Sequence, residues 1–349
     1  MQFNIRKHIL HFKQKAGTSR GVYTERKVWY VTLSDEADAS HVGVGECAPL
    51  PKLSCDDLPD AEYMALLDKY VRKVASGELT LENLRHDEGL RNLPSMLFGL
   101  ESALWHYRRC SVSLSDTAFA RGERGICING LIWMGEIDVM LRRAKEKYDM
   151  GFRCLKFKIG SKDFNKEMDL LKAIRAEFGN SITMRVDANC AYTSDFYLNK
   201  VEPILHSLDI HSIEQPVKVA DIAGLTRCCA ESRVDVALDE SLIGTKTADE
   251  MAELLDTVKP QYIILKPTLC GGLTGANEWI KTAKERGIGY WATSALESNV
   301  GLLAISQWSS TISVDIPQGL GTGMIYSNNI DKGLYIEGEK IWWKETIAK

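Results

Sequence analysis

The sequence lacks the features that mark several large classes of protein. Its nine cysteines are an odd number without a C-x-x-C pair, which argues against a disulfide framework and against a zinc knuckle. No apolar run approaches the ~18 residues of a membrane span, and the first eight residues carry two positive charges and a histidine where a signal peptide needs an apolar stretch. The 43 lysines and arginines do not exceed the 47 acidic residues, so no basic footprint for nucleic acid is present. We expect a cytoplasmic protein with reduced cysteines that binds neither nucleic acid nor membranes.

What is present is an ordinary globular composition. The 349 residues are 45% hydrophobic and 26% charged, which is enough for one large barrel and a smaller domain. Up to residue 122 the pattern predicts an α+β capping domain. Its expected parts are strands over residues 3–12 and 24–33, helices over 61–75 and from 95 onward, and loops over 16–21 and 47–55, the first of them mobile.

From residue 127 onward, apolar strands alternate with amphipathic helices. This alternation predicts parallel β/α units and, with eight strands, an α/β fold of the (β/α)8 barrel type over residues 123–321. We expect residues 322–349 to pack back on the capping domain. A doubly wound open sheet is the competing interpretation, but no G-x-G-x-x-G follows the early strands, and the glycines at 319, 321 and 323 are interpreted as a turn. The expected barrel strands are 127–133, 154–159, 183–186, 210–213, 234–238, 262–265, 289–292 and 313–316.

Polar residues at the ends of these strands carry the information about chemistry. In the second strand Lys156 and Lys158 alternate with apolar neighbours, so both point to one side, which we expect to be the barrel interior. Burying two lysines there is costly unless they serve a site. In the third strand Arg185, Asp187 and Asn189 share a face by the same period.

A row of acids continues from strand to strand. Asp187, Glu214, Asp239 and then Lys266 are 25 to 27 residues apart, about one β/α unit, so they should surround the mouth where active sites of such barrels lie. Three carboxylates without histidine or cysteine suit a hard divalent cation, Mg²⁺ first, with Mn²⁺ as a substitute. Lysines on both sides of a metal indicate proton abstraction next to the carboxylate of a small-molecule substrate.

Together these elements resemble the enolase superfamily in its muconate-lactonizing subgroup, whose sites use a lysine or histidine base with Mg²⁺. The K-x-K, D-x-N, E-Q-P, D-E-S and L-K-P elements stand in the order and spacing of that family along nearly the whole chain. The resemblance implies a capping domain whose two loops close the barrel mouth. Within the subgroup, the chain is most similar to the o-succinylbenzoate synthases of menaquinone biosynthesis.

The resemblance also implies a role for each residue. Lys158 would remove the proton and return it to the departing hydroxide in a syn dehydration, Lys266 would stabilise the enediolate from the opposite side, and Lys156 would tune Lys158. The expected metal ligands are Asp187, Glu214 and Asp239. The residues expected to support them or to bind substrate are Arg185, Asn189, Glu240, Ser294, Glu297 and Ser298, the last three from an S-x-x-E-S pattern in the eighth-strand region.

Three other functions stay open. N-acylamino acid racemases share the S-x-x-E-S pattern and the lysine pair, so they are the nearest rival. Dipeptide epimerases carry D-x-D at that place, which this chain lacks. A barrel that binds a ligand through a metal without catalysis should have lost a lysine or a metal ligand, and none is missing here.

Overall fold

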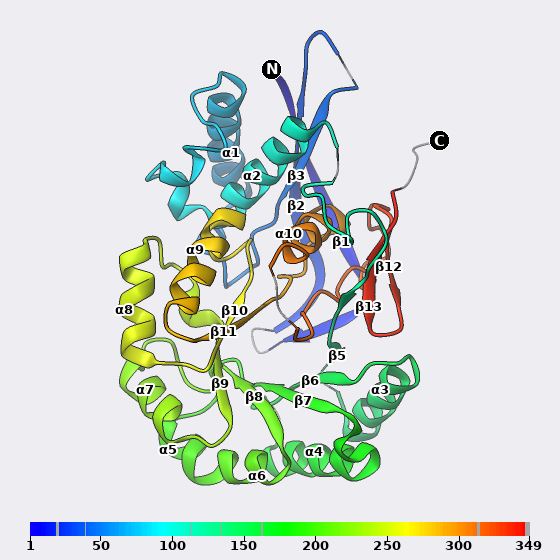
Figure 1. Cartoon of the computed structure of the whole chain (residues 1–349), viewed down its shortest axis with the longest axis vertical. Coiled ribbons are helices and arrows are strands. Elements are labelled where there is room, and N and C mark those ends of the chain that lie inside the picture. The colour runs from blue at the N-terminus through cyan, green and yellow to red at the C-terminus, as the bar shows by residue number, and fades with distance from the viewer. Residues whose placement is uncertain are drawn as a thin grey trace.

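The computed structural model describes residues 1–18, 21–38, 40–111, 113–133, 135–161, 163–312 and 315–345. Figure 1 shows a capping domain of sheet and helices above a curved sheet that is wrapped by helices. Within the described ranges, no helix combines the length and the apolar character that crossing a membrane requires. All nine cysteines lie within the described residues, and none of them forms a disulfide bond.

The capping domain is built on an antiparallel sheet with strand order β1–β2–β3. Helix α2 packs on β3 so closely that a Cβ atom at Gly45 would lie 1.9 Å from the carbonyl oxygen of Gly99, so both helix and strand need glycine there. The elements of this domain are β1 (Gln2–Thr18), β2 (Gly21–Ser34), β3 (Val42–Cys47), α1 (Asp60–Ala75), the 3₁₀ turns η1 (Leu84–His86) and η2 (Leu90–Asn92), and α2 (Pro94–Arg109).

The loop expected over residues 16–21 is largely strand. Pairing between β1 and β2 continues as far as Thr18 opposite Gly21, with an irregularity between His11 and Ala16. Ser19 and Arg20 lie outside the described residues. Small polar side chains misled the prediction, because a hairpin can extend through them when its backbone groups stay paired.

The barrel sheet contains seven parallel strands in the order β11–β10–β9–β8–β7–β6–β5. Its strands are β5 (Gly130–Ile132), β6 (Cys154–Lys158), β7 (Thr183–Asp187), β8 (Ile210–Glu214), β9 (Asp235–Leu238), β10 (Tyr262–Leu265) and β11 (Gly289–Ala292). The helical segments between and after them are α3 (Ile137–Asp149), α4 (Phe164–Phe178), η3 (Gly179–Ser181), α5 (Ser194–Phe196), η4 (Tyr197–Val201), α6 (Glu202–Ser207), α7 (Ile222–Glu231), η5 (Glu240–Leu242), α8 (Ala248–Val258), α9 (Gly272–Lys284) and α10 (Asn299–Ser309). This is the expected α/β barrel, and an open doubly wound sheet is excluded.

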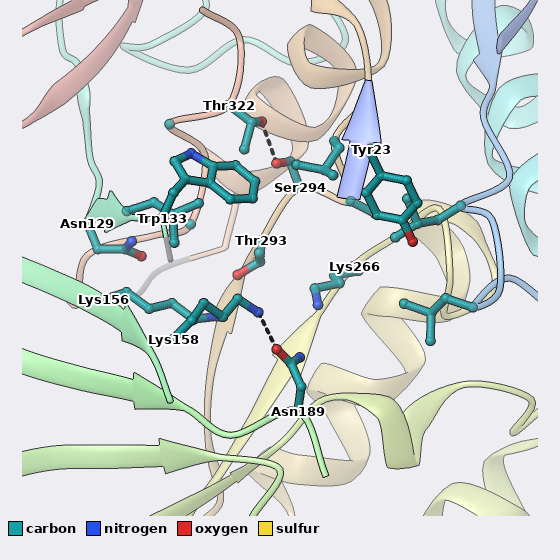
Figure 2. A pocket seen from close by; sticks show the side chains of 17 residues that line it. Tyr23, Asn129, Trp133, Lys156, Lys158, Asn189, Lys266, Thr293, Ser294 and Thr322 are labelled. Carbon is teal, nitrogen blue, oxygen red and sulfur yellow. Dashed lines mark hydrogen bonds between the residues drawn. The ribbon is translucent and has the colours of Figure 1, made fainter. Parts of the chain in front are cut away.

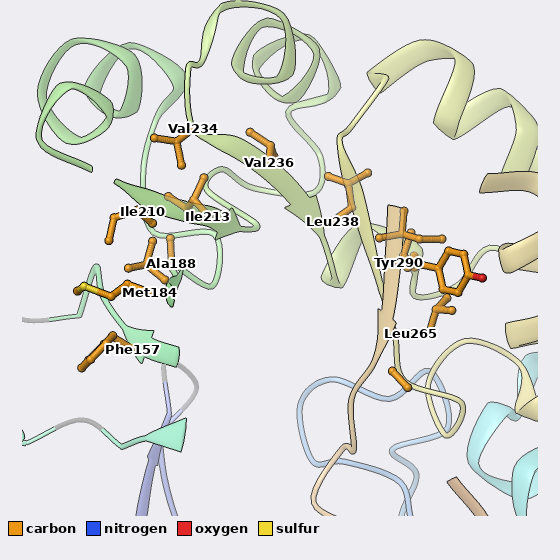
Figure 3. Close-up of a cluster of buried hydrophobic side chains, with 14 of the residues drawn as sticks. Phe157, Met184, Ala188, Ile210, Ile213, Val234, Val236, Leu238, Leu265 and Tyr290 are labelled. Carbon is orange, nitrogen blue, oxygen red and sulfur yellow. The ribbon is translucent and has the colours of Figure 1, made fainter. Parts of the chain in front are cut away.

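Alternation along the strands separates the core from the site. Leu155 and Phe157 of β6 are fully buried in the large apolar cluster between strands and helices, and Val186, Ile213 and Leu238 follow them on the next three strands. Figure 3 shows part of this cluster, with Phe157, Ile213 and Leu238 labelled. The residues between them along each strand therefore face the barrel interior.

The prediction of an eighth strand over residues 313–316 was wrong in its position. Ser313 and Val314 lie outside the described residues, and the eighth place is filled by Gln318, which bridges to Ile128, and by Gly319, which bridges to Thr293. The backbone amide of Gln318 donates to Cys127 (2.8 Å) and that of Gly319 to Ala292 (2.8 Å). Proline 317 supplies no N–H group, so only a two-residue contact forms where a strand was expected. It still joins the first strand segment to β11.

The carboxyl-terminal segment contacts two parts of the molecule. Lys13 of β1 donates its backbone amide to Ile325 (2.8 Å), and Tyr326 is buried in an apolar cluster with strand residues of the capping domain. Further on, β12 (Leu334–Glu337) and β13 (Lys340–Trp343) form a hairpin that pairs with β4 (Ile126–Cys127). The boundaries at residues 122 and 321 stay predictions.

Candidate active site

A pocket opens at the carboxyl ends of the barrel strands, beneath the capping domain. Tyr23, Leu50 and Leu53 of the capping domain form part of its wall. The barrel contributes its remaining lining, including Asn129, Leu131, Trp133, Lys156, Lys158, Asn189, Lys266, Thr293, Ser294 and Thr322. Figure 2 shows the lysine side chains and the amides of Asn129 and Asn189 converging on this space.

The two outer lysines of the site stand on opposite sides of the mouth. Lys158 ends β6 and Lys266 directly follows β10, and the three strands β7, β8 and β9 lie between them in the sheet. Both side chains are only 14% exposed. A substrate in the pocket would therefore have one ammonium group on each of two faces.

The row of acids occupies the sheet between these lysines. Asp187 ends β7, Glu214 ends β8 and Asp239 follows β9, and each is buried. The period-2 argument from the sequence thus brings together the residues that it singled out. Gln215, which sequence reasoning left without a role, fixes the next turn, because its side-chain oxygen accepts from the backbone amides of Asp239 and Ser241 (3.2 Å each).

Each acid of the row is turned toward a lysine. Lys156 lies 2.9 Å from Asp187 and also pairs with Glu214, Lys158 pairs with Asp187, and Lys266 pairs with Asp239. Burial opposes ionisation of Asp187, but the ammonium groups of Lys156 and Lys158 outweigh it and hold its pKa well below the usual range. Burial lowers the pKa of Lys266, but Asp239 and Glu214 outweigh it, so the pKa is raised.

Glu214 is the acid of this row whose hydrogen-bonding capacity the lysines do not fully satisfy. Its Oε1 is buried and has no hydrogen-bond partner among the described residues, and the ammonium of Lys266 is 4.0 Å away. Burial and the adjacent charge of Asp187 raise the pKa of Glu214 well above its usual value. A buried carboxylate with a free oxygen among other carboxylates indicates that positive charge is missing.

The donor set therefore fits a divalent cation. Among the described residues, no three acidic, histidine or cysteine side chains meet closely enough to hold an ion as they stand, because the carboxylates are turned onto the lysines. Three carboxylates on adjacent strands and the unsatisfied oxygen of Glu214 nevertheless provide the all-oxygen ligand set that hard divalent cations prefer.

A chain of hydrogen bonds supports Lys158. Its ammonium donates to Asn189 Oδ1 (2.8 Å), and Asn189 Nδ2 donates to Glu240 Oε1 (3.0 Å). Asn189 adopts a left-handed conformation (φ 43°), and its backbone amide donates to Asp187 (3.1 Å). These contacts fix the direction from which Lys158 enters the pocket.

Arg185 faces the barrel interior but does not line the pocket. Its guanidinium stacks over the Trp291 ring at 4.2 Å, and Nη1 donates to the carbonyl of Pro317 (2.8 Å). Arg185 therefore reaches across the barrel to the segment that replaces the eighth strand. It is 2% exposed.

The S-x-x-E-S pattern divides into two kinds of residue. It follows β11, the seventh strand, rather than the eighth. Ser294 lines the pocket and shares a hydrogen bond with Thr322 (2.6 Å), as Figure 2 shows. Glu297 and Ser298 are fully buried and do not line the pocket: Glu297 accepts from Thr268 and from the backbone of Ala295 (2.8 Å), and Ser298 donates to a glutamate of the capping domain.

Several pocket residues were missed from the sequence, among them Asn129, Trp133 and Tyr23. Asn129 directly precedes β5 and lies two positions before the pocket residue Leu131, so the period-2 argument could have found it. Trp133 directly follows β5 and was assigned only to a strand. Tyr23 lies on β2 and donates from its hydroxyl to Pro51 (3.0 Å), a contact between separate segments that has no signal in local sequence.

Comparison with known proteins agrees with this geometry. Residues 139–327 match the family described as enolase C-terminal domain-like. The chain is 39% identical to o-succinylbenzoate synthase of Desulfotalea psychrophila, over 97% of this chain and 98% of that protein. The crystal structure of MenC from that organism superposes with a TM-score of 0.83 at 35% identity, covering 98% and 99% of the two chains. An L-amino acid-D/L-Glu epimerase of Francisella philomiragia is 30% identical over about half of each chain, 50% of this one and 48% of that one. The chain belongs to the enolase superfamily.

Proposed function

We propose that the protein is an o-succinylbenzoate synthase, a carbon–oxygen lyase that dehydrates 2-succinyl-6-hydroxy-2,4-cyclohexadiene-1-carboxylate in menaquinone biosynthesis in the cytoplasm. The observation that carries the proposal is the placement of Lys158 and Lys266 on opposite sides of one row of buried carboxylates. The similarity to a synthase over the full length of both chains supports it.

Lys158 serves as the base in this proposal. It removes the proton on the carbon next to the ring carboxylate, the electron pair forms the new carbon–carbon double bond, and the bond to the 6-hydroxyl breaks. The same ammonium then returns its proton to the departing hydroxide, so that water leaves from the same face. Lys266, from the other face, stabilises the negative charge that develops on the carboxylate oxygens.

The remaining charged residues prepare this reaction. Asp187, Glu214 and Asp239 would hold Mg²⁺, with Mn²⁺ as a substitute, and the bound ion would supply Lewis-acid stabilisation of the developing charge. Lys156 neutralises part of the acid row next to Lys158, and Asn189 with Glu240 orients Lys158. Arg185, Glu297 and Ser298 support the walls, and Ser294 offers a hydroxyl to the substrate.

Racemisation of N-acylamino acids is the second candidate. Racemisation removes a proton from one face of a carbon and returns a proton to the other face, which requires an acid–base group on each side. The two opposed lysines provide these groups. The similarity to an epimerase over about half of the chain supports a reaction of this type. No D-x-D stands in residues 293–301, which disfavours dipeptides as substrates.

The test is turnover of the cyclohexadiene substrate, followed by absorbance with Mg²⁺ and again with excess EDTA. Rapid metal-dependent aromatisation is expected. No turnover with Mg²⁺ or Mn²⁺ would contradict the synthase assignment. N-succinyl amino acids and dipeptides in D₂O, monitored for loss of the α-proton signal, then distinguish racemase, epimerase and a non-catalytic barrel.

A further inference from the structure

Residues 293–298, here called the pocket loop, are held in place by contacts with other segments of the chain. Ala295 and Leu296 both line the pocket. Leu296 has a left-handed conformation (φ 65°), which is unfavourable for a branched side chain, and its carbonyl accepts from the Tyr326 hydroxyl (2.6 Å). Such a conformation persists only when surrounding contacts determine it.

Arg26 of the capping domain supplies one of these contacts. Its side chain lies on β2 and the residue is 2% exposed. One terminal nitrogen donates to the carbonyl of Ala295, and the other donates to the carbonyl of Ala48 (2.6 Å). Ala48 begins the segment that carries Leu50 and Leu53 into the pocket, here called the cap loop (residues 48–53). One buried guanidinium thus joins two walls of the pocket.

The charge of Arg26 has no acidic partner among the described residues. Burying a guanidinium is unfavourable unless hydrogen bonds compensate for lost water. The two carbonyls compensate its terminal nitrogens, while Nε is buried without a hydrogen-bond partner among the described residues. An apolar side chain could fill the same space at lower cost but could not fix the two carbonyls. We therefore expect Arg26 to fix the positions of the two carbonyls more than to increase the free energy of unfolding.

Glu46 holds the other end of the pocket loop. This fully buried residue of β3 accepts from the backbone amide of Ser298 (2.9 Å), from the Ser298 hydroxyl, and from the backbone amide of Gly301 (2.7 Å) at the start of α10. The capping domain therefore binds the loop at Ala295 through a guanidinium group and at Ser298 through a carboxyl group.

We propose that Arg26 is a positioning residue that fixes the pocket loop against the cap loop and so determines affinity for the part of the substrate distant from the reacting carbon. The inference rests on the proposed function. Lys158 and Lys266 lie on β6 and after β10, and no contact joins them to Arg26. Loss of Arg26 should therefore weaken binding and leave the proton-transfer steps nearly intact.

The experiment compares Arg26→Met and Arg26→Lys with wild type, using Lys27→Met as control, since Lys27 is an exposed neighbour on the same strand that pairs with Asp60. For Arg26→Met we expect a rise in KM of about tenfold (about 1.4 kcal/mol) with kcat within roughly threefold of wild type. The Kd of o-succinylbenzoate, measured by calorimetry, should rise in parallel. Arg26→Lys should recover most of the affinity, because an ammonium can still donate to these carbonyls, and Lys27→Met should change nothing.

A second readout does not depend on turnover. Hydrogen exchange of the backbone amides in residues 293–301 should be faster in Arg26→Met than in wild type, and unchanged in Lys27→Met. Unchanged exchange, unchanged KM with a lower kcat, or a lower melting temperature as the sole effect would each overturn the inference. Should Arg26→Met fail to fold, Arg26→Gln takes its place, since the shorter amide side chain cannot reach both carbonyls. A raised KM at nearly unchanged kcat would support the inference, and an unchanged KM would overturn it. A wild-type protein without turnover contradicts the proposed function instead, and the exchange comparison still decides the role of Arg26.

Discussion

One carboxyl oxygen of Glu101 on α2 accepts two hydrogen bonds from Thr274 in the first turn of α9, one from its backbone amide (3.0 Å) and one from its hydroxyl. The second carboxyl oxygen accepts from the backbone amide of Leu273 (2.6 Å). The capping domain thus places a carboxylate at the positive end of the helix that follows Lys266. Burial raises the pKa of Glu101 to about 7, against hydrogen bonds that lower it.

This raised pKa predicts how stability depends on pH. The folded protein keeps a proton on Glu101 up to about pH 7, whereas the unfolded chain loses it near its usual value of 4.5. The free energy of unfolding should therefore fall as pH rises through this window, by on the order of 2 kcal/mol from this group. Glu101→Gln should flatten that decline in urea titrations between pH 5 and 7. An exposed control, Glu82→Gln, should keep it; equal slopes in wild type and Glu101→Gln would contradict the assignment.

Replacement of either opposed lysine should abolish turnover. We expect Lys158→Ala and Lys266→Ala each to lose about 10³-fold or more in kcat, since each removes an acid–base or charge-stabilising group. Lys172→Ala, an exposed residue of α4, is the matched control. If either variant retained more than about a tenth of the wild-type kcat, the replaced lysine would not have the role proposed for it.

Glu214 predicts a difference between metal-free and metal-loaded protein. Its buried, unsatisfied oxygen makes the charge costly without a cation, so metal-free Glu214→Gln should be at least as stable as metal-free wild type. Mg²⁺ at 100 times its Kd should add about 2.7 kcal/mol to the free energy of unfolding of the wild type and so raise its melting temperature. The melting temperature of the variant should not change. An equal Mg²⁺ response in both proteins would exclude Glu214 as a ligand.

Gln318 should contribute to closure of the barrel. Its side-chain oxygen accepts from the backbone amide of Ala292 (2.7 Å), and its nitrogen donates to the carbonyl of Ile316 (2.6 Å). Gln318→Ala removes these partners from the buried amide of Ala292 and the part-buried carbonyl of Ile316, which should cost about 1–3 kcal/mol in the free energy of unfolding. Chemical denaturation measures this loss, and the exposed Gln2→Ala should show none. No loss in Gln318→Ala would mean that other contacts close the barrel.

The half of the mouth that carries the lysines and the acids could be predicted because it follows from local periodicity. Strands that are buried on their helical face leave alternate residues for the interior, so Lys156, Lys158 and Asp187 could be assigned to the site from spacing alone. Repetition of one β/α unit then carried the same argument to Glu214 and Asp239. The family match and the full-length similarity to a synthase confirmed the resemblance that these motifs indicated.

The rest of the pocket depends on contacts between segments that are far apart in the sequence, and local periodicity does not predict such contacts. Gln318 replaces an expected strand because Pro317 cannot donate to a ladder. Glu297 and Ser298 belong to a recognisable pattern, yet a pattern does not tell which side chains face substrate and which face the capping domain. Tyr23 enters the pocket only because the domain above the barrel brings it there.

The pairing of β13 with β4 has a consequence for folding. Lys340 lies opposite Cys127, on the order of 200 residues earlier in the chain, and Ile341 lies opposite Ile126. The segment that introduces the barrel therefore gains its sheet partner only after nearly all of the described chain has been synthesised. Contacts of such high sequence separation form slowly, so we expect this small sheet to assemble late in folding, after the central β/α units have packed.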